Sequence, residues 1–270
     1  MVIEGEHEGL TEFPSIVAGP VEEQIAESIV DRMTNGACIQ LGVGGMPDAI
    51  GKLIAESELK DLGIHTELLV NAYLDMHKAG KITNLNKHDI MRGKSVFSIA
   101  HGTKELFDWV ADNPSMCCAP INYVNDLSVI GEIDNFVSIN SCIAVDLFGQ
   151  ISAESAGTRH ISGTGGQLDF LTAGFKNPRA QSFIALPSTY TDKKGNLHSN
   201  IKPTFTGGDI ITDPRSQAYT MVTEYGIENL AGASVWERAE KLISLAHPDF
   251  REELIESAKK VNVWRQSNKR

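Results

Sequence analysis

Residues 37–67 read ACIQLGVGGMPDAIGKLIAESELKDLGIHTE, and this stretch decides the fold. Its first part, 37–41, is a short apolar run that stops at the glycine-rich segment 42–47, which is typical of a buried strand leading into a loop of bare backbone. Pro47 suits the first position of a helix and Asp48 the first turn, so we expect a helix that begins at Pro47. A second strand starts at His65. The stretch therefore predicts a βαβ unit with a glycine loop after its first strand.

The loop and the second strand together suggest a ligand site. Backbone N–H groups of a glycine loop, next to a helix N-terminus, attract phosphates and carboxylates. The loop has neither the G-x-G-x-x-G spacing of a dinucleotide site nor the G-K-[ST] of a P-loop. A strand-end glutamate such as Glu67 is more often solvated or ion-paired than catalytic. Because Glu67 stands beside this loop in one βαβ unit, we treat it as a candidate for chemistry.

Length and charge limit the class of protein. The chain has 270 residues, enough for one large α/β domain or two small ones, and a formal net charge of −11 with a pI near 5.2. Nucleic acid and anionic membranes are poor partners for such an acidic chain. The start of the chain has no signal-peptide pattern, and no run of 18 apolar residues is present. We expect a cytoplasmic protein that does not span a membrane.

Four cysteines are scattered along the chain, at Cys38, Cys117, Cys118 and Cys142. The adjacent pair at 117–118 is a poor spacing for a zinc site or a C-x-x-C redox pair. No histidine and acid cluster suggests a metal ligand set. We expect reduced thiols in the core and no metal.

The rest of the chain alternates between helical and strand-like patterns. Residues 1–18 are polar and irregular and predict a linker or arm, whereas residues 19–270 predict one domain with a helical C-terminal tail. The alternation indicates a mostly parallel, twisted sheet flanked by helices. After Pro120 we expect a β-rich insertion of short segments, and we expect further strands at 182–186, 209–212 and 220–224.

A second glycine loop, SGTGGQ at 162–167, again lies between a strand-like segment and a helical one, and we expect both loops to lie near Glu67. A loop of this kind is equally typical of a turn that only leads into a helix and binds no ligand. His65 and His101 are candidate general bases, but a lone histidine is more often packed or hydrogen-bonded. Ser162 does not stand in a G-x-S-x-G nucleophile elbow, so a serine hydrolase is a poor rival.

Seven motifs in chain order resemble the acetyl-CoA hydrolase/transferase family, closest to its members that act on 4-hydroxybutyrate and butyrate. They are LGVGGMP (41–47), GIHTE (63–67), GTKEL (102–106), NSC (140–142), ISGTGGQLDF (161–170), VTEYG (222–226) and AHPDF (246–250). The resemblance runs from Val21 to the C-terminus and covers the C-terminal half of such enzymes. It implies a NagB/RpiA/CoA-transferase-like fold and a CoA-transferase C-terminal catalytic domain over 19–270. It also implies that an N-terminal domain or a second subunit completes the enzyme, with the arm at 1–18 in the place of the interdomain linker.

The resemblance assigns roles to particular residues. It makes Glu67 the nucleophile that becomes an anhydride and then a CoA thioester. It implies contacts with CoA at Gly165 and Cys142 and along the first loop, at Gly42, Val43, Gly44, Gly45 and Met46. Coenzyme A is then a substrate, and no cofactor is implied.

The expected function is transfer of CoA between short-chain carboxylic acids such as butyrate, 4-hydroxybutyrate and acetate, by a homo-oligomer. An acyl-CoA hydrolase is the first alternative, because it differs only in whether water or a carboxylate attacks the enzyme thioester. A non-catalytic CoA-binding or assembly module that lacks its partner domain is the second.

Overall fold

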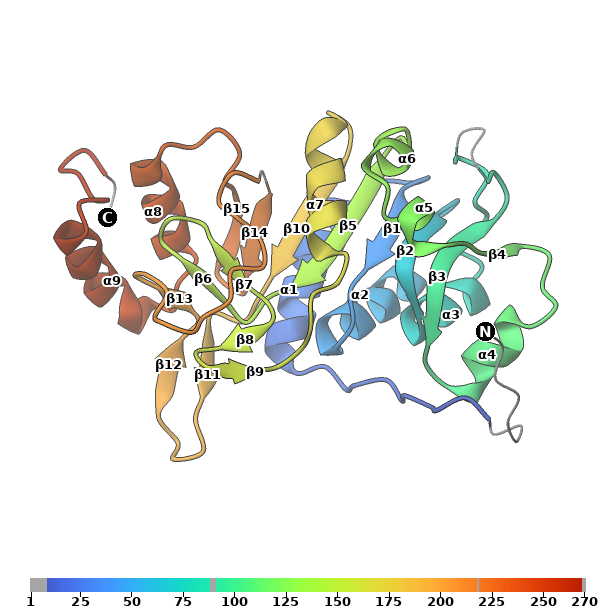
Figure 1. Cartoon of the computed structure of the whole chain (residues 1–270), viewed down its shortest axis with the longest axis horizontal. Helices are drawn as coiled ribbons and strands as arrows, with labels where there is room; N and C mark the ends of the chain where they lie inside the picture. Colours follow the sequence, from blue (N-terminus) through green and yellow to red (C-terminus); the bar gives the residue numbers. More distant parts are fainter. Residues whose placement is uncertain (1–8, 88–90, 218, 269–270) are drawn as a thin grey trace.

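The computed structural model describes residues 9–87, 91–217 and 219–268, and these fold into a mixed α/β structure around one large sheet (Figure 1). Within these ranges the sheet has the strand order β15-β14-β10-β5-β1-β2-β3-β4. Its strands are β1 (Cys38–Leu41), β2 (Gly63–Val70), β3 (Ser95–His101), β4 (Met116–Cys118), β5 (Phe136–Ser141), β10 (Gln181–Ala185), β14 (Thr220–Thr223) and β15 (Gly226–Asn229). β15 runs antiparallel to β14, and the other neighbours are parallel. The predicted fold class, a mostly parallel sheet flanked by helices, is confirmed.

Helices cover both faces of this sheet. One face carries α1 (Pro20–Val30), α2 (Gly45–Glu56), α3 (Asn71–Lys78) and α4 (Lys104–Val110), and the other carries α5 (Ile121–Val124), α6 (Leu127–Gly131) and α7 (Gln167–Lys176). In Figure 1, α7 and α5 lie in front of the sheet and α2 and α3 behind it. The helices α8 (Val235–Ser244) and α9 (Pro248–Lys260) lie at the end of the molecule next to β15 (Figure 1). None of the helices in the described ranges is long and apolar enough to span a membrane.

The β-rich insertion begins later than the sequence predicts. Residues after Pro120 form α5 and α6, and Phe136–Ser141 is the central strand β5 of the main sheet. The insertion follows β5 and consists of β6 (Ala144–Asp146), β7 (Ile151–Ser152), β8 (Ser155–Ala156), β9 (Arg159–His160), β11 (Thr189–Thr191), β12 (Leu197–Ser199) and β13 (Ile201–Lys202). The hairpin of β11 and β12 projects from the body of the molecule (Figure 1).

Strand order places a ligand crevice beside β1. From β1 the chain moves through β2 and β3 to β4 on one side, with helices on one face, and then returns to β5 on the other side, with helices on the opposite face. The loops that follow β1 and β5 therefore diverge at the carboxyl edge of the sheet. In open α/β sheets such a switch point is where ligands bind.

Residues 9–19 form an extended arm along the carboxyl ends of the strands, and residues 1–8 lie outside the described ranges (Figure 1). Phe13 N–H donates to Gly102 O at 2.8 Å, and its ring stacks on His101 with centroids 3.9 Å apart. Glu12 accepts a hydrogen bond from the Lys104 N–H at 2.9 Å, at the start of α4. The arm is thus docked on the domain rather than projecting from it.

Three other expectations need correction. The helix after the first loop begins at Gly45 instead of Pro47, so Pro47 is its third residue. The segment 209–212 is not a strand: Ile210 N–H donates to Ser155 Oγ at 2.7 Å, and the Asp209 carboxylate accepts from the N–H groups of Thr206 and Gly157. The four cysteines are free thiols, but Cys118 is exposed, so the prediction that all four lie in the core is wrong.

Candidate active site

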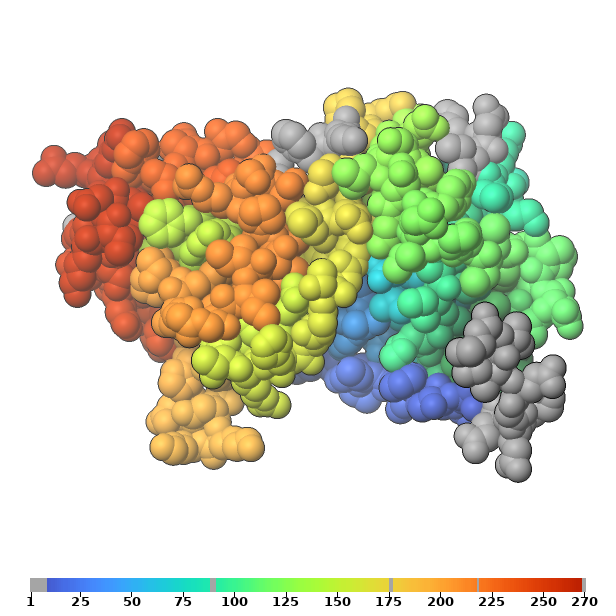
Figure 2. Space-filling view, in the orientation of Figure 1, coloured from blue at the N-terminus to red at the C-terminus, as the bar shows by residue number. Residues whose placement is uncertain are grey.

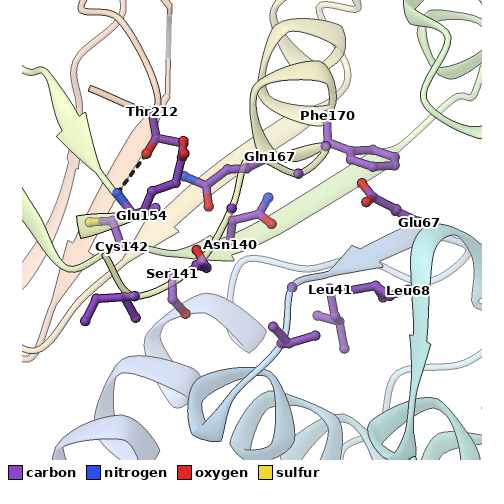
Figure 3. A pocket seen from close by; sticks show the side chains of 18 of the residues that line it. Leu41, Glu67, Leu68, Asn140, Ser141, Cys142, Glu154, Gln167, Phe170 and Thr212 are labelled. Carbon is purple, nitrogen blue, oxygen red and sulfur yellow. Dashed lines mark hydrogen bonds between the residues drawn. The ribbon is translucent and has the colours of Figure 1, made fainter. Parts of the chain in front are cut away.

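The two glycine loops line one cavity of ≈ 420 Å³ at the carboxyl edge of the sheet (Figure 3). Gly42 and Val43 come from the loop after β1, and Gly163, Gly165 and Gly166 come from the loop before α7. The end of β5 and the β-rich insertion supply the remaining wall. The expectation that the loops meet near Glu67 is therefore confirmed as geometry, and the roles of the residues stay predictions.

Glu67 lies in the middle of β2, not at the strand end that the sequence suggested. The register pairs Cys38 with Gly63 and Ile39 with Ile64, so Glu67 is the first residue of β2 beyond the end of β1 at Leu41. On the β1 side, Glu67 therefore lies beside the loop that follows β1 and not beside a paired strand residue. The side chain reaches the cavity because β1 is shorter than β2.

Glu67 is held on one of its two carboxyl oxygens. Oε2 accepts a hydrogen bond at 2.9 Å from Nδ2 of Asn125, the residue that caps the C-terminal end of α5. The backbone of Gly166 packs against the same oxygen, because a Cβ added at Gly166 would stand 2.0 Å from Oε2. A Cβ added at Gly165 would stand 3.9 Å from Oε1. The second glycine loop is thus in contact with the carboxylate that the sequence singled out.

A second acid shares the amide of Asn125. Asn125 Nδ2 also donates to Asp169 Oδ2 at 3.3 Å, from the first turn of α7. Burial raises the pKa of Asp169 above its usual range and the Glu67 carboxylate adds to this, while the hydrogen bond from Asn125 acts in the opposite direction. Sequence reasoning missed Asn125, which stands on a short helix with no motif of its own.

Buried amides form the floor of the cavity between β1 and β5. Gln40 Nε2 donates to Asn140 Oδ1 at 3.1 Å, and Gln40 Oε1 accepts from Ser138 Oγ at 2.8 Å and from Asn140 Nδ2 at 3.0 Å. Asn140 is the first residue of β5 beyond the end of β1, since Leu41 pairs with Ile139. A Cβ on Gly42 would stand 3.2 Å from Asn140 Oδ1, so this glycine permits the close approach. The network fixes the two strand ends relative to each other.

Cys142 lies at the far side of the cavity from Glu67 (Figure 3). Desolvation, together with the nearby Asp213 carboxyl group, raises the pKa of the Cys142 thiol. Its backbone N–H donates to Ala185 O at 3.2 Å. A neutral thiol is a weak nucleophile, so the chemistry of this pocket favours Glu67 over Cys142 as the attacking group.

An acidic group stands behind this side of the pocket. Asp213 is fully buried, accepts from Gln167 Nε2 at 2.6 Å, and has its pKa raised to about 6 by burial, with Glu154 adding to the shift. Glu154 lines the cavity and accepts from Thr164 Oγ1 at 3.1 Å. Nothing in the sequence pattern distinguished these two acids. Across the described ranges, no group of three or more His, Cys, Asp or Glu side chains is arranged to hold a metal ion.

The other residues of the first loop lie away from this cavity. Gly44 lines a small neighbouring cavity under the arm, and Met46 is buried in the core of the α1–α3 face. Gly45 and Met46 belong to the first turn of α2. The Gly42 N–H donates to Ile139 O at 2.9 Å and is therefore engaged in the sheet.

Neither candidate histidine is placed as a general base. His65 is fully buried, with Nε2 2.8 Å from Val124 O, and burial lowers its pKa to about 4. His101 lies under the Phe13 ring of the arm. The packed reading of both histidines is confirmed.

Comparison with known proteins assigns the chain to a family. A family model described as the acetyl-CoA hydrolase/transferase C-terminal domain matches residues 102–258. The chain is 52% identical over 270 residues to a butyryl-CoA:acetate CoA-transferase of Anaerostipes caccae, covering all of this chain and 60% of that protein. The chain thus spans about 60% of the length of the curated relatives it matches.

Two solved structures resemble the fold closely. RipA from Yersinia pestis has a TM-score of 0.86 at 39% identity, over 96% of this chain and 56% of that one. A 4-hydroxybutyrate CoA-transferase from Porphyromonas gingivalis has a TM-score of 0.78 at 36% identity, over 94% of this chain and 58% of that one. With the family model spanning more than half of its residues, the chain belongs to the acetyl-CoA hydrolase/transferase family and carries its C-terminal domain.

Proposed function

We propose that this chain is the catalytic C-terminal part of a CoA-transferase that moves CoA between short-chain carboxylic acids such as butyrate, 4-hydroxybutyrate and acetate. The observation that carries the proposal is the Glu67 carboxylate, anchored on Oε2 by Asn125 and packed against the second glycine loop in the wall of the cavity. The similarity to transferases named for butyryl-CoA, acetate and 4-hydroxybutyrate supports the substrate class.

In the proposed cycle Glu67 attacks the thioester carbonyl of acyl-CoA, forming an acyl-glutamyl anhydride and releasing the CoA thiolate. The thiolate attacks the glutamyl carbonyl, the first acid leaves as its carboxylate, and a glutamyl-CoA thioester remains. A second carboxylate reverses these steps and leaves as the new acyl-CoA. Each attack passes through an oxyanion, which fixed hydrogen-bond donors near the glycine loop stabilise.

The proposed contacts to CoA are the backbone of the first loop, from Gly42 to Met46, together with Cys142 and Gly165. Coenzyme A acts as a substrate and no cofactor is required. We further propose that the active enzyme is cytoplasmic and homo-oligomeric, and that an N-terminal domain or second subunit covers the carboxyl edge of the sheet. Residues 1–18 are then the linker or arm to that domain, and residues 19–270 the catalytic domain with its helical tail.

An assay with butyryl-CoA distinguishes the functions. The chain is assayed alone and with any partner that co-purifies from its native host, with and without acetate. Acetate-dependent formation of acetyl-CoA supports the transferase, and release of free CoA without acetate supports the hydrolase. Binding of CoA without turnover under both conditions would identify a non-catalytic module. We expect the chain alone to bind CoA weakly and turn over slowly, because its pocket lies open at the edge of the sheet.

A further inference from the structure

Asn125 occupies an unusual position between two carboxyl groups. It ends the short helix α5, and its Nδ2 donates both to Glu67 Oε2 at 2.9 Å and to Asp169 Oδ2 at 3.3 Å. Only the NH₂ end of an amide can donate to two carboxylates at once, so the orientation of this side chain is fixed by its neighbours. Its own Oδ1 is buried without a hydrogen-bond partner among the described residues.

The amide makes the two oxygens of Glu67 unequal. Oε2 is enclosed by Asn125 and by the backbone of Gly166. A Cβ atom added at Gly166 would lie 2.0 Å from Glu67 Oε2 and 2.3 Å from Asn125 Nδ2. Oε1 lies toward Gly165 and accepts no hydrogen bond in the part of the chain that the structure describes. Oε1 is therefore the oxygen available to attack an acyl carbon, and Oε2 keeps its hydrogen bond to Asn125.

Resting on the proposed transferase function, we propose that Asn125 is a further catalytic residue, whose amide stabilises the oxyanion that forms on Glu67 itself. A carboxylate that attacks through Oε1 keeps Oε2 as the carbonyl oxygen of the anhydride. When the CoA thiolate adds to the Glu67 carboxyl carbon, the carbonyl electron pair moves onto Oε2. The carbonyl then re-forms, the bond from the carbon to Oε1 breaks, and the first acid leaves with both electrons and with Oε1.

The donor is in place throughout these steps. Asn125 Nδ2 is within hydrogen-bond distance of Oε2 before the reaction, and the negative charge on that oxygen is greatest in the tetrahedral intermediate. A fixed donor aimed at a developing oxyanion stabilises the transition state without reorganisation. Asp169 is a positioning residue in this account, because its carboxyl group holds the second N–H of the amide.

The surroundings leave room for the attacking groups. Glu67, Gly165 and Gly166 line the glycine-loop cavity of ≈ 420 Å³ and also a second, more open cavity of ≈ 510 Å³ to which Asn125 and Asp169 contribute. The carboxylate therefore forms part of the wall between two spaces. In Figure 2 the yellow atoms of the segment around α7 lie beside the green atoms of the segment that contains α5 and α6.

The test compares Asn125→Ala and Asn125→Leu with the matched control Asn122→Ala. Asn122 lies on the same helix and lines the same second cavity, but its side chain is exposed. Asn125→Leu keeps a branched side chain of similar shape and removes the donor without adding a charge, so it separates hydrogen bonding from packing. The complete enzyme is assayed for kcat and KM with butyryl-CoA and acetate, and the amount of CoA attached to Glu67 is followed by peptide mass spectrometry.

Loss of one oxyanion donor lowers kcat by about 100- to 1,000-fold. We expect losses of this size in both Asn125 variants, with KM for butyryl-CoA little changed, slower loading of CoA onto Glu67, and near-normal kinetics in Asn122→Ala. Circular dichroism establishes that each variant is folded.

Two results would overturn the proposal. If wild-type enzyme carries the adduct on Glu67 and Asn125→Leu turns over within a few-fold of it, the donor is not needed and only this inference fails. If wild-type enzyme shows neither an adduct nor acetate-dependent exchange, the transferase function fails as well.

Discussion

At the scale of single residues, the site depends on the length and anchoring of one side chain. Glu67 reaches the cavity because β1 ends one residue before the position that would pair with it. Asn125 fixes which of the two Glu67 carboxyl oxygens is free. A carboxylate used as a nucleophile has to be held at the right distance from the substrate carbon. The distance is therefore the most sensitive property of the site.

Shortening the side chain tests this sensitivity. Glu67→Asp withdraws the carboxyl group by about 1.5 Å, one carbon–carbon bond. Since a misplacement of about 1 Å can cost about 100-fold in rate, we expect kcat of the complete enzyme to fall by at least that factor. The hydrogen bond to Asn125 should break at the same time. An unchanged thermal unfolding midpoint serves as the control, and a variant with wild-type kcat would remove Glu67 from the mechanism.

The sequence identifies some residues of this site and not others. Glu67 and the two glycine loops are recognisable because Glu67 lies in a strand-like run and each loop lies between a strand-like and a helical segment. Asn125 and Asp213 are not, because they reach the site from α5 and from an irregular segment through tertiary packing. A polar residue without a local motif gains its role only from neighbours that are distant in the chain.

At the scale of elements, the second glycine loop needs a glycine at one particular position. Gly166 has φ −82° and ψ 5°, which any residue can adopt, so its backbone conformation does not require glycine. The requirement comes from space, because an added Cβ would stand 2.0 Å from Glu67 Oε2. At Gly165 the corresponding distance is 3.9 Å, an ordinary contact.

This difference gives a matched pair of variants. Gly166→Ala should displace the Glu67 carboxylate and reduce kcat by about 100-fold, the cost of roughly 1 Å of misplacement. Gly165→Ala should keep most of the activity if its part in CoA binding is made by the backbone. Steady-state kinetics on the two variants in parallel is the measurement. Equal activities of the two would show that the contact with Glu67 is unimportant.

The prediction of helices and strands is correct where the periodicity of apolar residues is strong, and it is wrong where side chains form hydrogen bonds with the backbone. The strands β2, β10 and β14 and the helix α7 lie close to where the apolar patterns place them. Residues 209–212 have the composition of a strand, but Asp209 accepts from Thr206 N–H at 2.9 Å and closes a local turn instead. The pattern of apolar residues contains no signal for such hydrogen bonds between side chains and the backbone.

At the scale of the whole molecule, alternating elements predict a mostly parallel sheet but not the order of its strands. That order places β1 between β2 and β5 and so creates the crevice. It results from contacts between segments about 100 residues apart, such as Gln40 with Asn140. A single sequence contains no direct signal for such contacts.

Acid stability should depend on the buried His65. Burial lowers the pKa of its imidazole to about 4, with Lys87 adding to the shift and the bond to Val124 opposing it. Above about pH 6.5 the side chain is neutral in both the folded and the unfolded chain. Between pH 6.5 and 4 the unfolded chain takes up a proton that the folded protein does not, so the free energy of unfolding falls as the pH falls.

The expected loss from His65 between pH 7 and pH 4.5 is about 2.5 kcal/mol. Asp213 acts in the opposite direction, because its pKa is raised to about 6 and the folded state is the first to take up its proton. Urea unfolding of wild type and His65→Gln at both pH values separates the two, since the variant lacks only the histidine contribution. An identical pH dependence in both proteins would mean that His65 titrates normally in the folded state.

The central claim is that Glu67 carries CoA as a thioester. Its most direct measurement is peptide mass spectrometry of the complete enzyme after incubation with butyryl-CoA and no acceptor acid. The account predicts the mass of CoA on the peptide that contains Glu67, and its loss when acetate is added. CoA attached to Cys142 or to another residue, or acetate-dependent exchange that persists at the wild-type rate in Glu67→Ala, would contradict it.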